Sequence, residues 1–370
     1  MRGIVLKNLM RISIYMMIFI GLMVVGPSCS ESETEESTST TSSTTSETTQ
    51  ATAAPTPEPE SNKLVIYSGR SEKLVGPIIE QFALTSGIDV DVKYGKTAEI
   101  AATIMEEGSN SPADLFFAQD PGGLGVIEAN DMFIALPDTI TGLVPDNRKS
   151  EMNKWVGITG RARTLVHNTG IDKGDLPNDL WELVNDSRWK GKIGYAPTNG
   201  SFQAMVSGMR AEWGEEKTEE WLNALLAQDP QIYPKNTPQV AAAAAGEIDI
   251  GLVNHYYLHR FLADQGDAFE ARNHHLPAGG PGSIVLVAGA GVLKTADNED
   301  NALLFLNYLL STVGQQYFAA QTYEYPLVEG VKTQRILTPL GEINSPQISY
   351  TKMNDLQGTI DLLTKVGALQ

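Results

Sequence analysis

The sequence predicts an α/β protein of two lobes, in which each lobe is a mixed, mostly parallel sheet flanked by helices and two crossover strands join the lobes. Three observations lead to this prediction. From Lys63 onward, short β-branched runs alternate with helical segments, as in parallel sheets that helices cover on both faces. The alternation occurs as two separate series, and two long extended runs separate them. The alternative is one large doubly wound domain, although a single core seldom serves more than about 250–300 residues.

The first series contains three pairs of a strand and a helix. The predicted strands read KLVIYSG, IDVDVKYG and ADLFFAQ, and the predicted helices that follow them read SEKLVGPIIEQFALTSG, TAEIAATIMEEG and PGGLGVIEAN. Gly87 and Gly108 stand where the first two helices should end, and Thr97 stands where the second should begin. The extended run 155–168 has no helix beside it. It is therefore the first predicted crossover strand.

The second series repeats the pattern with the strands GKIGYAP, QIYPKN and IDIGLVN. Its predicted helices are TNGSFQAMVSGMRAEW, TEEWLNALLAQ and TPQVAAAAAGE. A second long extended run, 282–293, leads into two more helical segments. We therefore assign residues 63–155 and 290–370 to the first lobe and residues 156–289 to the second. Such an architecture places a hinge in the crossovers and a cleft between the lobes.

The first 28 residues have the composition of an export signal. Three basic residues and no acidic residue precede or accompany a short apolar run that ends at PSCS. We therefore predict a signal peptide over residues 1–28, and the alternative is an N-terminal membrane-anchoring helix. The chain's single cysteine, Cys29, follows directly, where a bacterial lipoprotein carries its lipid. With no second cysteine, an intrachain disulfide is excluded.

Residues 29–62 are predicted to be the lipidated cysteine and a disordered tether. The segment is rich in Ser, Thr and Glu and contains no lysine, arginine or aromatic residue, so it has nothing to bury. Without the signal peptide the chain has 24 basic and 45 acidic residues. This balance excludes general binding of nucleic acid. We expect an exported monomer in the periplasm or on the outer face of the cytoplasmic membrane, touching the membrane only through the lipid.

The candidate chemistry lies in the loops that follow the predicted strands, because ligands meet the carboxyl ends of strands in such sheets. Tyr256 and Tyr257 stand at one strand end, in LVNHYYLHR. A phenolate oxygen is a hard donor, and a trivalent iron ion is able to deprotonate a phenol as it binds. The alternative for the pair is packing. His255 and His259 have no third ligand nearby and are predicted to be surface or capping residues.

A second strand end, PTNGSF, opens a helix. The backbone N–H groups of Gly200 and Ser201, with the Ser201 hydroxyl, suit an anion at the positive helix end. The alternative is an ordinary helix cap by Asn199 or Ser201. Arg161 and Arg163 are two residues apart and therefore point to the same side of the first crossover strand. There they face the cleft, or alternatively they are solvated or form salt bridges.

Catalytic motifs are missing from the sequence. It has no GxSxG elbow, no P-loop and no HExxH, and its one cysteine belongs to the leader. We therefore do not expect an enzyme. The one enzymatic alternative is a hydrolase that pairs Asp120 with Glu72 or Glu99.

Several segments, taken in order, resemble a known family. They are YSGRSEKLVGPIIEQFALTSGIDVDV, EEGSNSPADLFFAQ, WVGITGRARTLVHNT, WKGKIGYAPTNGSF, YPKN, GEIDIGLVNHYYLHRF, AGAGVLK and EYPL. This set resembles the ferric-iron-binding solute receptors of bacterial ABC importers, the bacterial transferrins of the Fbp/Fut type, over nearly all of residues 63–370. The resemblance implies a type II periplasmic-binding-protein fold, binding of Fe(III) in the cleft and delivery to an ABC permease in the membrane.

The resemblance also implies roles for individual residues. Tyr256 and Tyr257 match the paired tyrosines that ligate iron. Asn199, Gly200 and Ser201 match the loop that holds a synergistic anion such as phosphate or carbonate, and Asn236 and Asn254 match asparagines that assist there. Arg161 and Arg163 lie in the segment that supplies an anion-binding arginine in some members.

Three positions depart from the family's ligand sets. Ser71 stands in place of a histidine, Gln119 in place of a glutamate and Phe202 in place of a further tyrosine. Two phenolates leave an octahedral ion four ligands short, so an anion, water, Gln119 or the adjacent Asp120 must complete the shell. The leading hypothesis is Fe(III) with a synergistic anion. The alternative is the same receptor carrying an organic anion, a phosphonate or another small solute without metal.

Overall fold

The computed structural model describes residues 62–369. The predicted signal peptide, Cys29 and all but the last residue of the predicted tether lie outside the described residues. Within residues 62–369 no helix is long and apolar enough to cross a membrane.

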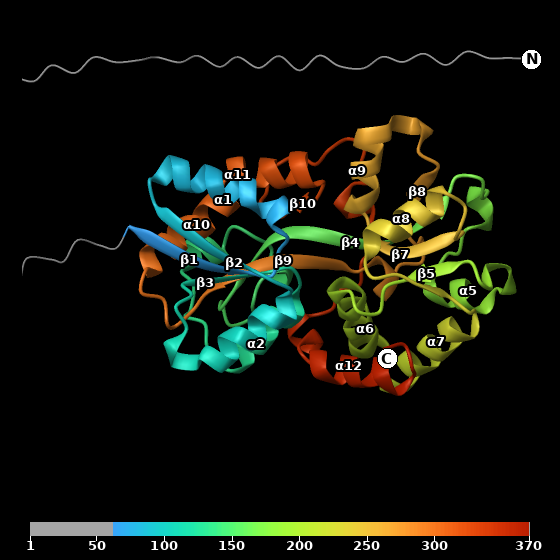
Figure 1. The fold of residues 1–370 in the computed structure, drawn as a ribbon, viewed down its shortest axis with the longest axis horizontal. Helices are drawn as coiled ribbons and strands as arrows, with labels where there is room; N and C mark the ends of the chain where they lie inside the picture. The colour runs from blue at the N-terminus through green and yellow to red at the C-terminus, as the bar shows by residue number, and fades with distance from the viewer. Residues whose placement is uncertain (1–61, 370) are drawn as a thin grey trace, which may run out of the picture. The chain divides into compact units, whose positions relative to one another are not determined.

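The strands form a mixed sheet in the order β2-β1-β3-β9-β4-β7-β5-β6, and β8 and β10 also pair with β4 (Figure 1). Pairs β1–β2, β1–β3, β5–β6 and β5–β7 are parallel, and the pairs made by β4 and β9 are antiparallel. The strands are β1 (Lys63–Ser68), β2 (Asp89–Tyr94), β3 (Leu115–Ala118), β4 (Val156–Asn168), β5 (Ile193–Tyr195), β6 (Gln231–Ile232), β7 (Ile250–Asn254), β8 (Ala271–His274), β9 (Val285–Val292) and β10 (Tyr325–Pro326).

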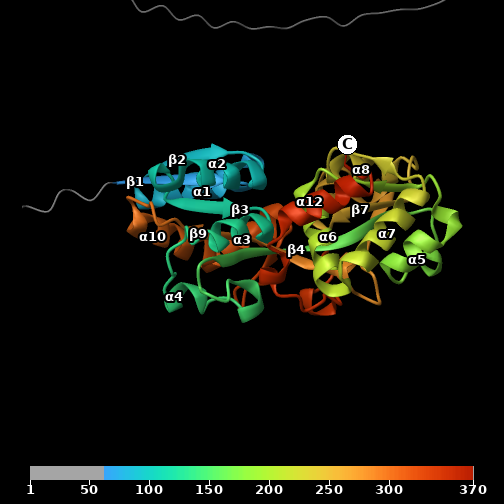
Figure 2. The ribbon, with the colours of Figure 1, turned by 90° about the horizontal axis from the view of Figure 1, so that it is seen from below.

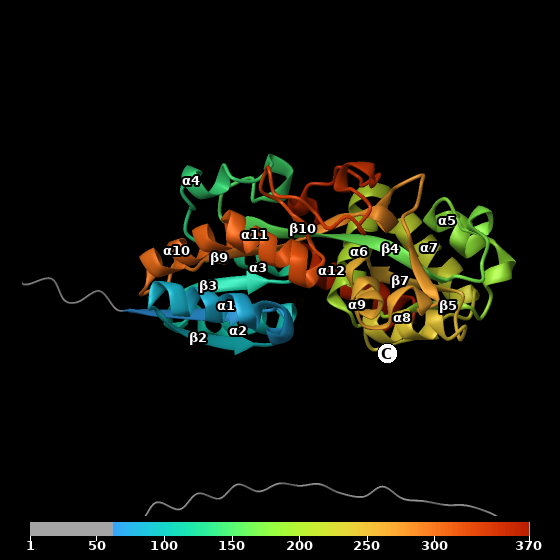
Figure 3. The ribbon, with the colours of Figure 1, turned by 90° about the horizontal axis from the view of Figure 1, so that it is seen from above.

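The long strand β4 joins the two halves of the sheet. Its first half, up to Ala162, pairs with β9, and its second half, from Arg163, pairs with β7. The second predicted crossover is β9, which connects β3 to β4. Figure 3 shows β4 running from one half into the other. The predicted α/β class with two crossover strands is confirmed, while the short strands β8 and β10 were not predicted.

Helices cover both faces of each half of the sheet (Figure 1). They are α1 (Glu72–Ser86), α2 (Thr97–Glu107), α3 (Pro121–Ala129), α4 (Asp138–Thr141), α5 (Leu180–Asn185), α6 (Gly200–Trp213), α7 (Glu215–Ala227), α8 (Asn236–Ala244), α9 (Tyr256–Gln265), α10 (Glu299–Leu310), α11 (Thr312–Tyr317) and α12 (Leu356–Lys365).

The first helix shows why these segments fold as they do. Residues of α1 that recur at helical spacing are buried against the sheet, among them Val75, Ile79 and Phe82. Gly87 ends the helix in the left-handed conformation, φ 73°, and its N–H donates to the Ala83 carbonyl. Burial of one such face on each helix supplies most of the driving force for the fold.

The C-terminal segment contacts both halves of the sheet. Its helix α12 packs on α6, where the Ser207 and Thr359 hydroxyls lie 2.8 Å apart and Arg210 pairs with Asp355 at 2.8 Å. The short 3-10 helix before it, η9 (Tyr350–Met353), contacts α3 as well as α6. Figure 2 shows α12 beside α6. The lobe boundaries proposed from the sequence stay a prediction, with this segment in contact with both predicted lobes.

Candidate ligand-binding cleft

A cleft of about 590 Å³ opens where strand-end loops from the two halves of the sheet meet. That volume lies within the range of about 300–1,000 Å³ usual for small-molecule sites. The lining residues on which the following description depends are Ser71, Lys96, Thr97, Gln119, Asp120, Asn199, Gly200, Lys235, Tyr257, Met353 and Leu356. Segments that follow β1, β2, β3, β5, β6 and β7 contribute most of them, so the candidate chemistry lies at the carboxyl ends of the strands.

The two tyrosines lie side by side at the start of α9. Their rings stack with centroids 4.3 Å apart and an interplanar angle of 29°. Tyr257 lines the cleft, whereas Tyr256 is fully buried beneath it. Among the described residues, the Tyr256 hydroxyl has no hydrogen-bond partner. A buried hydroxyl without a partner is costly and calls for an explanation, and a bound ligand supplies one.

Two arginines surround the tyrosine pair. The guanidinium carbon of Arg260 lies 5.3 Å from the Tyr256 ring centre and 5.5 Å from that of Tyr257. Arg163, on β4, is buried, and burial followed by the charge of Arg161 lowers its pKa to about 9, while the two phenols act in the opposite direction. Sequence reasoning missed Arg260, although its spacing of four residues from Tyr256 places both on one helix face.

The pKa of Tyr257 lies above its usual range. Burial is the largest cause, the neighbouring phenol of Tyr256 adds to it, and Asn236 and Arg260 act in the opposite direction. Tyr257 is therefore a neutral phenol at neutral pH. Only a strongly polarising cation can turn it into a phenolate ligand under these conditions.

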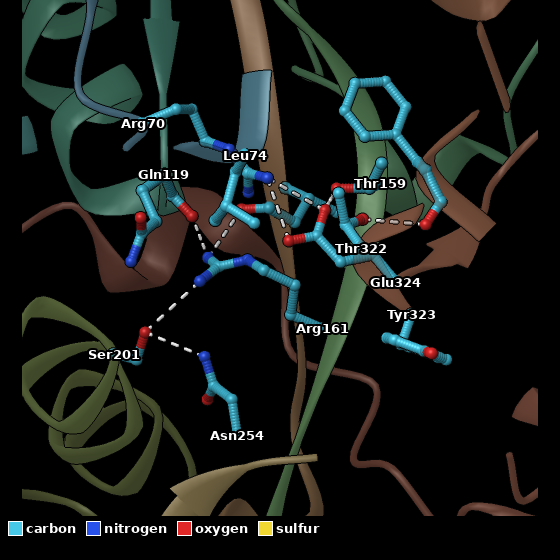
Figure 4. Close-up of polar contacts among 12 residues, drawn as sticks. Arg70, Leu74, Gln119, Thr159, Arg161, Ser201, Asn254, Thr322, Tyr323 and Glu324 are labelled. Atoms are coloured by element: carbon cyan, nitrogen blue, oxygen red, sulfur yellow. Dashed lines mark hydrogen bonds and ion pairs between the residues drawn. The ribbon is translucent and has the colours of Figure 1, made fainter. Parts of the chain in front are cut away.

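A hydrogen-bond network links β4 to both walls of the cleft (Figure 4). Arg161 donates through Nη1 to the Ser201 hydroxyl at 3.2 Å and through Nη2 to the Gln119 carbonyl. Asn254 Nδ2 donates to the same hydroxyl at 3.0 Å, and its Oδ1 accepts from Arg163 Nη1 at 3.0 Å. The predicted anion-binding residues Arg161, Arg163, Ser201 and Asn254 therefore lie in one buried cluster.

The loop before α6 contains an ordinary helix cap. Asn199 is the N-cap, and its Oδ1 accepts from the Ser201 N–H at 3.1 Å. Asn236 Nδ2, at the start of α8, donates to the same oxygen at 3.4 Å. Asn199 and Gly200 also line the cleft. The cap therefore occupies the Ser201 N–H, one of the two N–H groups predicted to bind an anion.

The three positions that depart from the family pattern differ in location. Ser71 and Gln119 line the cleft. Phe202 is fully buried and packs against Tyr195, with ring centroids 5.5 Å apart. Phe202 is thus a core residue without a donor atom.

The carboxylates do not form a second reactive pair. Glu99 is exposed and pairs with Lys96 at 3.1 Å, whereas Asp120 is buried in the cleft wall. Glu72 lies in the first turn of α1. Within residues 62–369 no group of three or more His, Cys, Asp or Glu side chains is arranged to hold a metal ion. The described residues of the cleft thus offer a hard cation the phenol of Tyr257 and single oxygen-bearing side chains such as Asp120 and Gln119.

The prediction that His255 and His259 are surface or capping residues is wrong about their exposure, because both are buried; His255 does stand at the N-cap of α9, but its side chain makes no cap hydrogen bond. His255 is fully buried, its Nδ1 accepts from the Ala162 N–H at 3.1 Å, and its Nε2 donates to the Tyr323 carbonyl at 2.8 Å. Its ring stacks on Tyr325 at 4.6 Å. His259 is 6% exposed. His255 thus joins the crossover β4 to the segment before β10, because its two ring nitrogens match the backbone groups there.

We expect this burial to make folding pH-dependent. Burial lowers the pKa of His255 to about 3, whereas an unfolded chain protonates histidine below about pH 6.5. Between pH values of about 3 and 6.5 the folded state therefore binds fewer protons than the unfolded state. As the pH drops through this range, His255 lowers the free energy of unfolding by about 1.4 kcal/mol per pH unit. The contribution is fully present above about pH 6.5.

His255→Gln tests this prediction, because glutamine keeps a donor and an acceptor without titrating. Between about pH 6.5 and 5 the variant should lose about 2 kcal/mol less than the wild type. Urea unfolding at several pH values measures the difference. His259 and His275, whose pKa values burial lowers to about 4, contribute equally to both proteins. Equal pH slopes in the two proteins would contradict the prediction.

Comparison with known proteins identifies the family of this chain. Residues 110–339 match the family described as bacterial extracellular solute-binding protein. The major ferric iron-binding protein of Neisseria meningitidis serogroup B is 32% identical over 82% of this chain and 92% of that protein. Iron uptake protein A1 of Synechocystis is 31% identical over 80% of this chain and 84% of that protein.

Solved structures show the same fold. Iron-bound HitA from Pseudomonas aeruginosa has a TM-score of 0.78 and 31% identity, over 82% of this chain and 99% of that one. Trichodesmium IdiA (FutA), in complex with iron and citrate ligands, has a TM-score of 0.71 and 28% identity over the same shares. The fold is thus that of an extracytoplasmic solute receptor of the type II periplasmic-binding-protein class. The chain belongs to the bacterial extracellular solute-binding protein family, in its Fbp-type group of ferric-binding receptors.

Proposed function

We propose that this protein is an exported receptor that binds Fe(III) in its cleft through Tyr256 and Tyr257 and delivers it to an ABC permease. The stacked tyrosine pair is the observation that carries the proposal. The two phenol rings stack with their centres 4.3 Å apart, and Tyr257 lines the cleft. Hard oxygen donors of this kind suit a hard trivalent ion.

The nearby cations favour an anionic partner for the iron. Arg161 and Arg163 are buried, and their hydrogen bonds go to neutral groups such as Ser201 and Asn254. Among the described residues, Arg161 Nε and Arg163 Nε and Nη2 have no partner. Buried charges of one sign stabilise a ligand of the opposite sign. A synergistic anion such as carbonate or phosphate, near the loop 199–201, would meet this requirement.

Export and delivery follow from the family and from the leader. The family is one of extracellular solute-binding proteins, and the sequence begins with the predicted signal peptide 1–28. We propose that Cys29 carries a lipid, so that the tether holds the receptor near its permease. Ligand binding is sufficient to explain the cleft, so we propose no enzymatic activity for the protein.

Addition of ferric iron tests the proposal directly. The purified protein should develop a reddish colour through tyrosinate-to-iron charge transfer, with one iron retained per chain in equilibrium dialysis. A colourless protein that retains no iron, with or without added carbonate or phosphate, would rule out the proposed function.

A second candidate cargo is an organic anion, phosphonate or similar small solute without metal. The cleft volume of about 590 Å³ favours it, since this space exceeds the need of one ion and one inorganic anion. In this case Arg161, Arg163 and the loop 199–201 would supply the binding. Citrate or a phosphonate without metal should then raise the melting temperature with increasing concentration, as mass action requires. No such shift is expected if iron is the cargo.

A further inference from the structure

Asp120 is a buried carboxylate in the wall of the cleft. Asp120 is the second residue after β3 and the N-cap of α3. It is 6% exposed. Burial raises the pKa of this carboxyl group, and Arg161, the N–H groups of Gly122 and Gly123 and the Thr97 hydroxyl oppose that effect. The Asp120 carboxyl group is thus buried close to the positive charge of Arg161.

The same carboxylate contacts the opposite wall of the cleft. A Cβ placed on Gly200, the first residue of α6, would lie 3.1 Å from Asp120 Oδ2. The 14-residue helix α6 presents the positive end of its dipole at this point. Gly200 has no side chain to keep the carboxylate away. Asp120 therefore lies where the loop 199–201 was expected to hold a free anion.

Arg161 ties the two walls together around this contact. Its guanidinium donates to the carbonyl of Gln119, the residue before Asp120, and to the hydroxyl of Ser201, the residue after Gly200. Figure 4 shows the guanidinium between these two groups. Arg161 Nε has no partner among the described residues. One cation thus holds both segments that bring the carboxylate and the helix end together.

We propose that Asp120 supplies the anion of this cleft, so that the protein binds ferric iron without added carbonate or phosphate. This inference rests on the proposed binding of Fe(III) by the two tyrosines, and it puts Asp120 in the place of the free anion. Iron and two phenolates together carry a single positive charge, which one carboxylate neutralises. A free dianion could bind at the same place in two ways. It would have to displace Asp120 from the end of α6, or it would have to lie beside the negative charge of Asp120 in a desolvated site. Both are costly.

The variant Asp120→Asn removes the charge and keeps the size of the side chain. The Asp120 side chain makes no cap hydrogen bond to α3, and asparagine suits the N-cap position equally well, so α3 and the fold should persist. Ferrous chloride is oxidised in place, in buffer free of carbonate and phosphate, and bound iron is read from the charge-transfer absorbance. Bicarbonate or phosphate is then added at millimolar concentration. Glu99→Gln, which removes an exposed carboxylate from α2, is the matched control.

Wild type and Glu99→Gln should bind iron equally well before and after the anion is added. Asp120→Asn should bind at least about tenfold more weakly without the anion, and the anion should restore most of the loss. Two results would overturn the inference while leaving the proposed function intact: a wild type that binds iron only after anion addition, and an Asp120→Asn variant that equals the wild type without it. A wild type that binds no iron under either condition would overturn the proposed function itself.

Discussion

Replacement of both Tyr256 and Tyr257 by phenylalanine is expected to abolish ferric binding and the charge-transfer colour. Loss of an outer partner of a metal ligand already costs about 10–100-fold in affinity, so loss of two direct ligands should exceed about 100-fold. The rings remain, so their stacking and their contacts with Arg260 remain as well. The fold should therefore be kept while the site is lost.

Equilibrium dialysis and visible absorbance measure this effect. Tyr308→Phe is the matched control, because Tyr308 lies on α10 outside the cleft lining and its hydroxyl has no partner among the described residues. The control should bind iron as the wild type does. The single variants Tyr256→Phe and Tyr257→Phe separate the contributions of the two residues, because Tyr257 lines the cleft and Tyr256 is buried behind it. A double variant that still binds iron and keeps its colour would show that the tyrosines are not ligands.

Glu324→Ala is expected to lower the free energy of unfolding by about 3–5 kcal/mol, because it leaves Arg70 as an uncompensated buried charge. Both side chains are fully buried, and Arg70 Nη2 lies 2.9 and 3.0 Å from the two carboxylate oxygens. The Thr159 hydroxyl on β4 donates to the same carboxylate at 2.6 Å (Figure 4). Among the described residues Arg70 Nε and Nη1 have no other partner. Glu324 thus connects the loop after β1 to the crossover strand.

Denaturant unfolding followed by tryptophan fluorescence measures the loss. A double variant, Arg70→Met with Glu324→Leu, should regain much of the stability, since apolar residues of similar volume often replace a buried ion pair without cost. Glu219→Gln, which removes the half-buried partner of the exposed Lys365, should leave the unfolding midpoint almost unchanged. A double variant no more stable than Glu324→Ala would show that the uncompensated charge is not the cause.

The architecture could be predicted because its signals are local. Strand and helix periodicity repeats within a few residues, so the α/β class and the crossovers β4 and β9 follow from the sequence. The two-residue strand β10 and the four-residue β8 were not predicted. Such short strands exist only because β4 offers a partner, and their own sequence has no recognisable period.

The candidate site could be predicted only in part. Tyr256, Tyr257 and the loop 199–201 stand at strand ends, and position along the chain was enough to select them. The histidines beside the tyrosines were misjudged, because their burial depends on β4 and on Tyr323, far away in sequence. A residue's neighbours in the chain do not report which distant segment covers it.

The sequence by itself determined the fold class and the tyrosine pair at a strand end, since each depends on the order and spacing of nearby residues; the leader stays a prediction of the sequence. Only the tertiary structure decided which charges meet. Arg70 and Glu324 are 254 positions apart and form one ion pair, and Asp120 reaches Gly200 across the cleft. Such contacts depend on the packing of whole elements, in which burial strengthens the attraction between opposite charges and makes an unpaired charge costly. No local spacing encodes them.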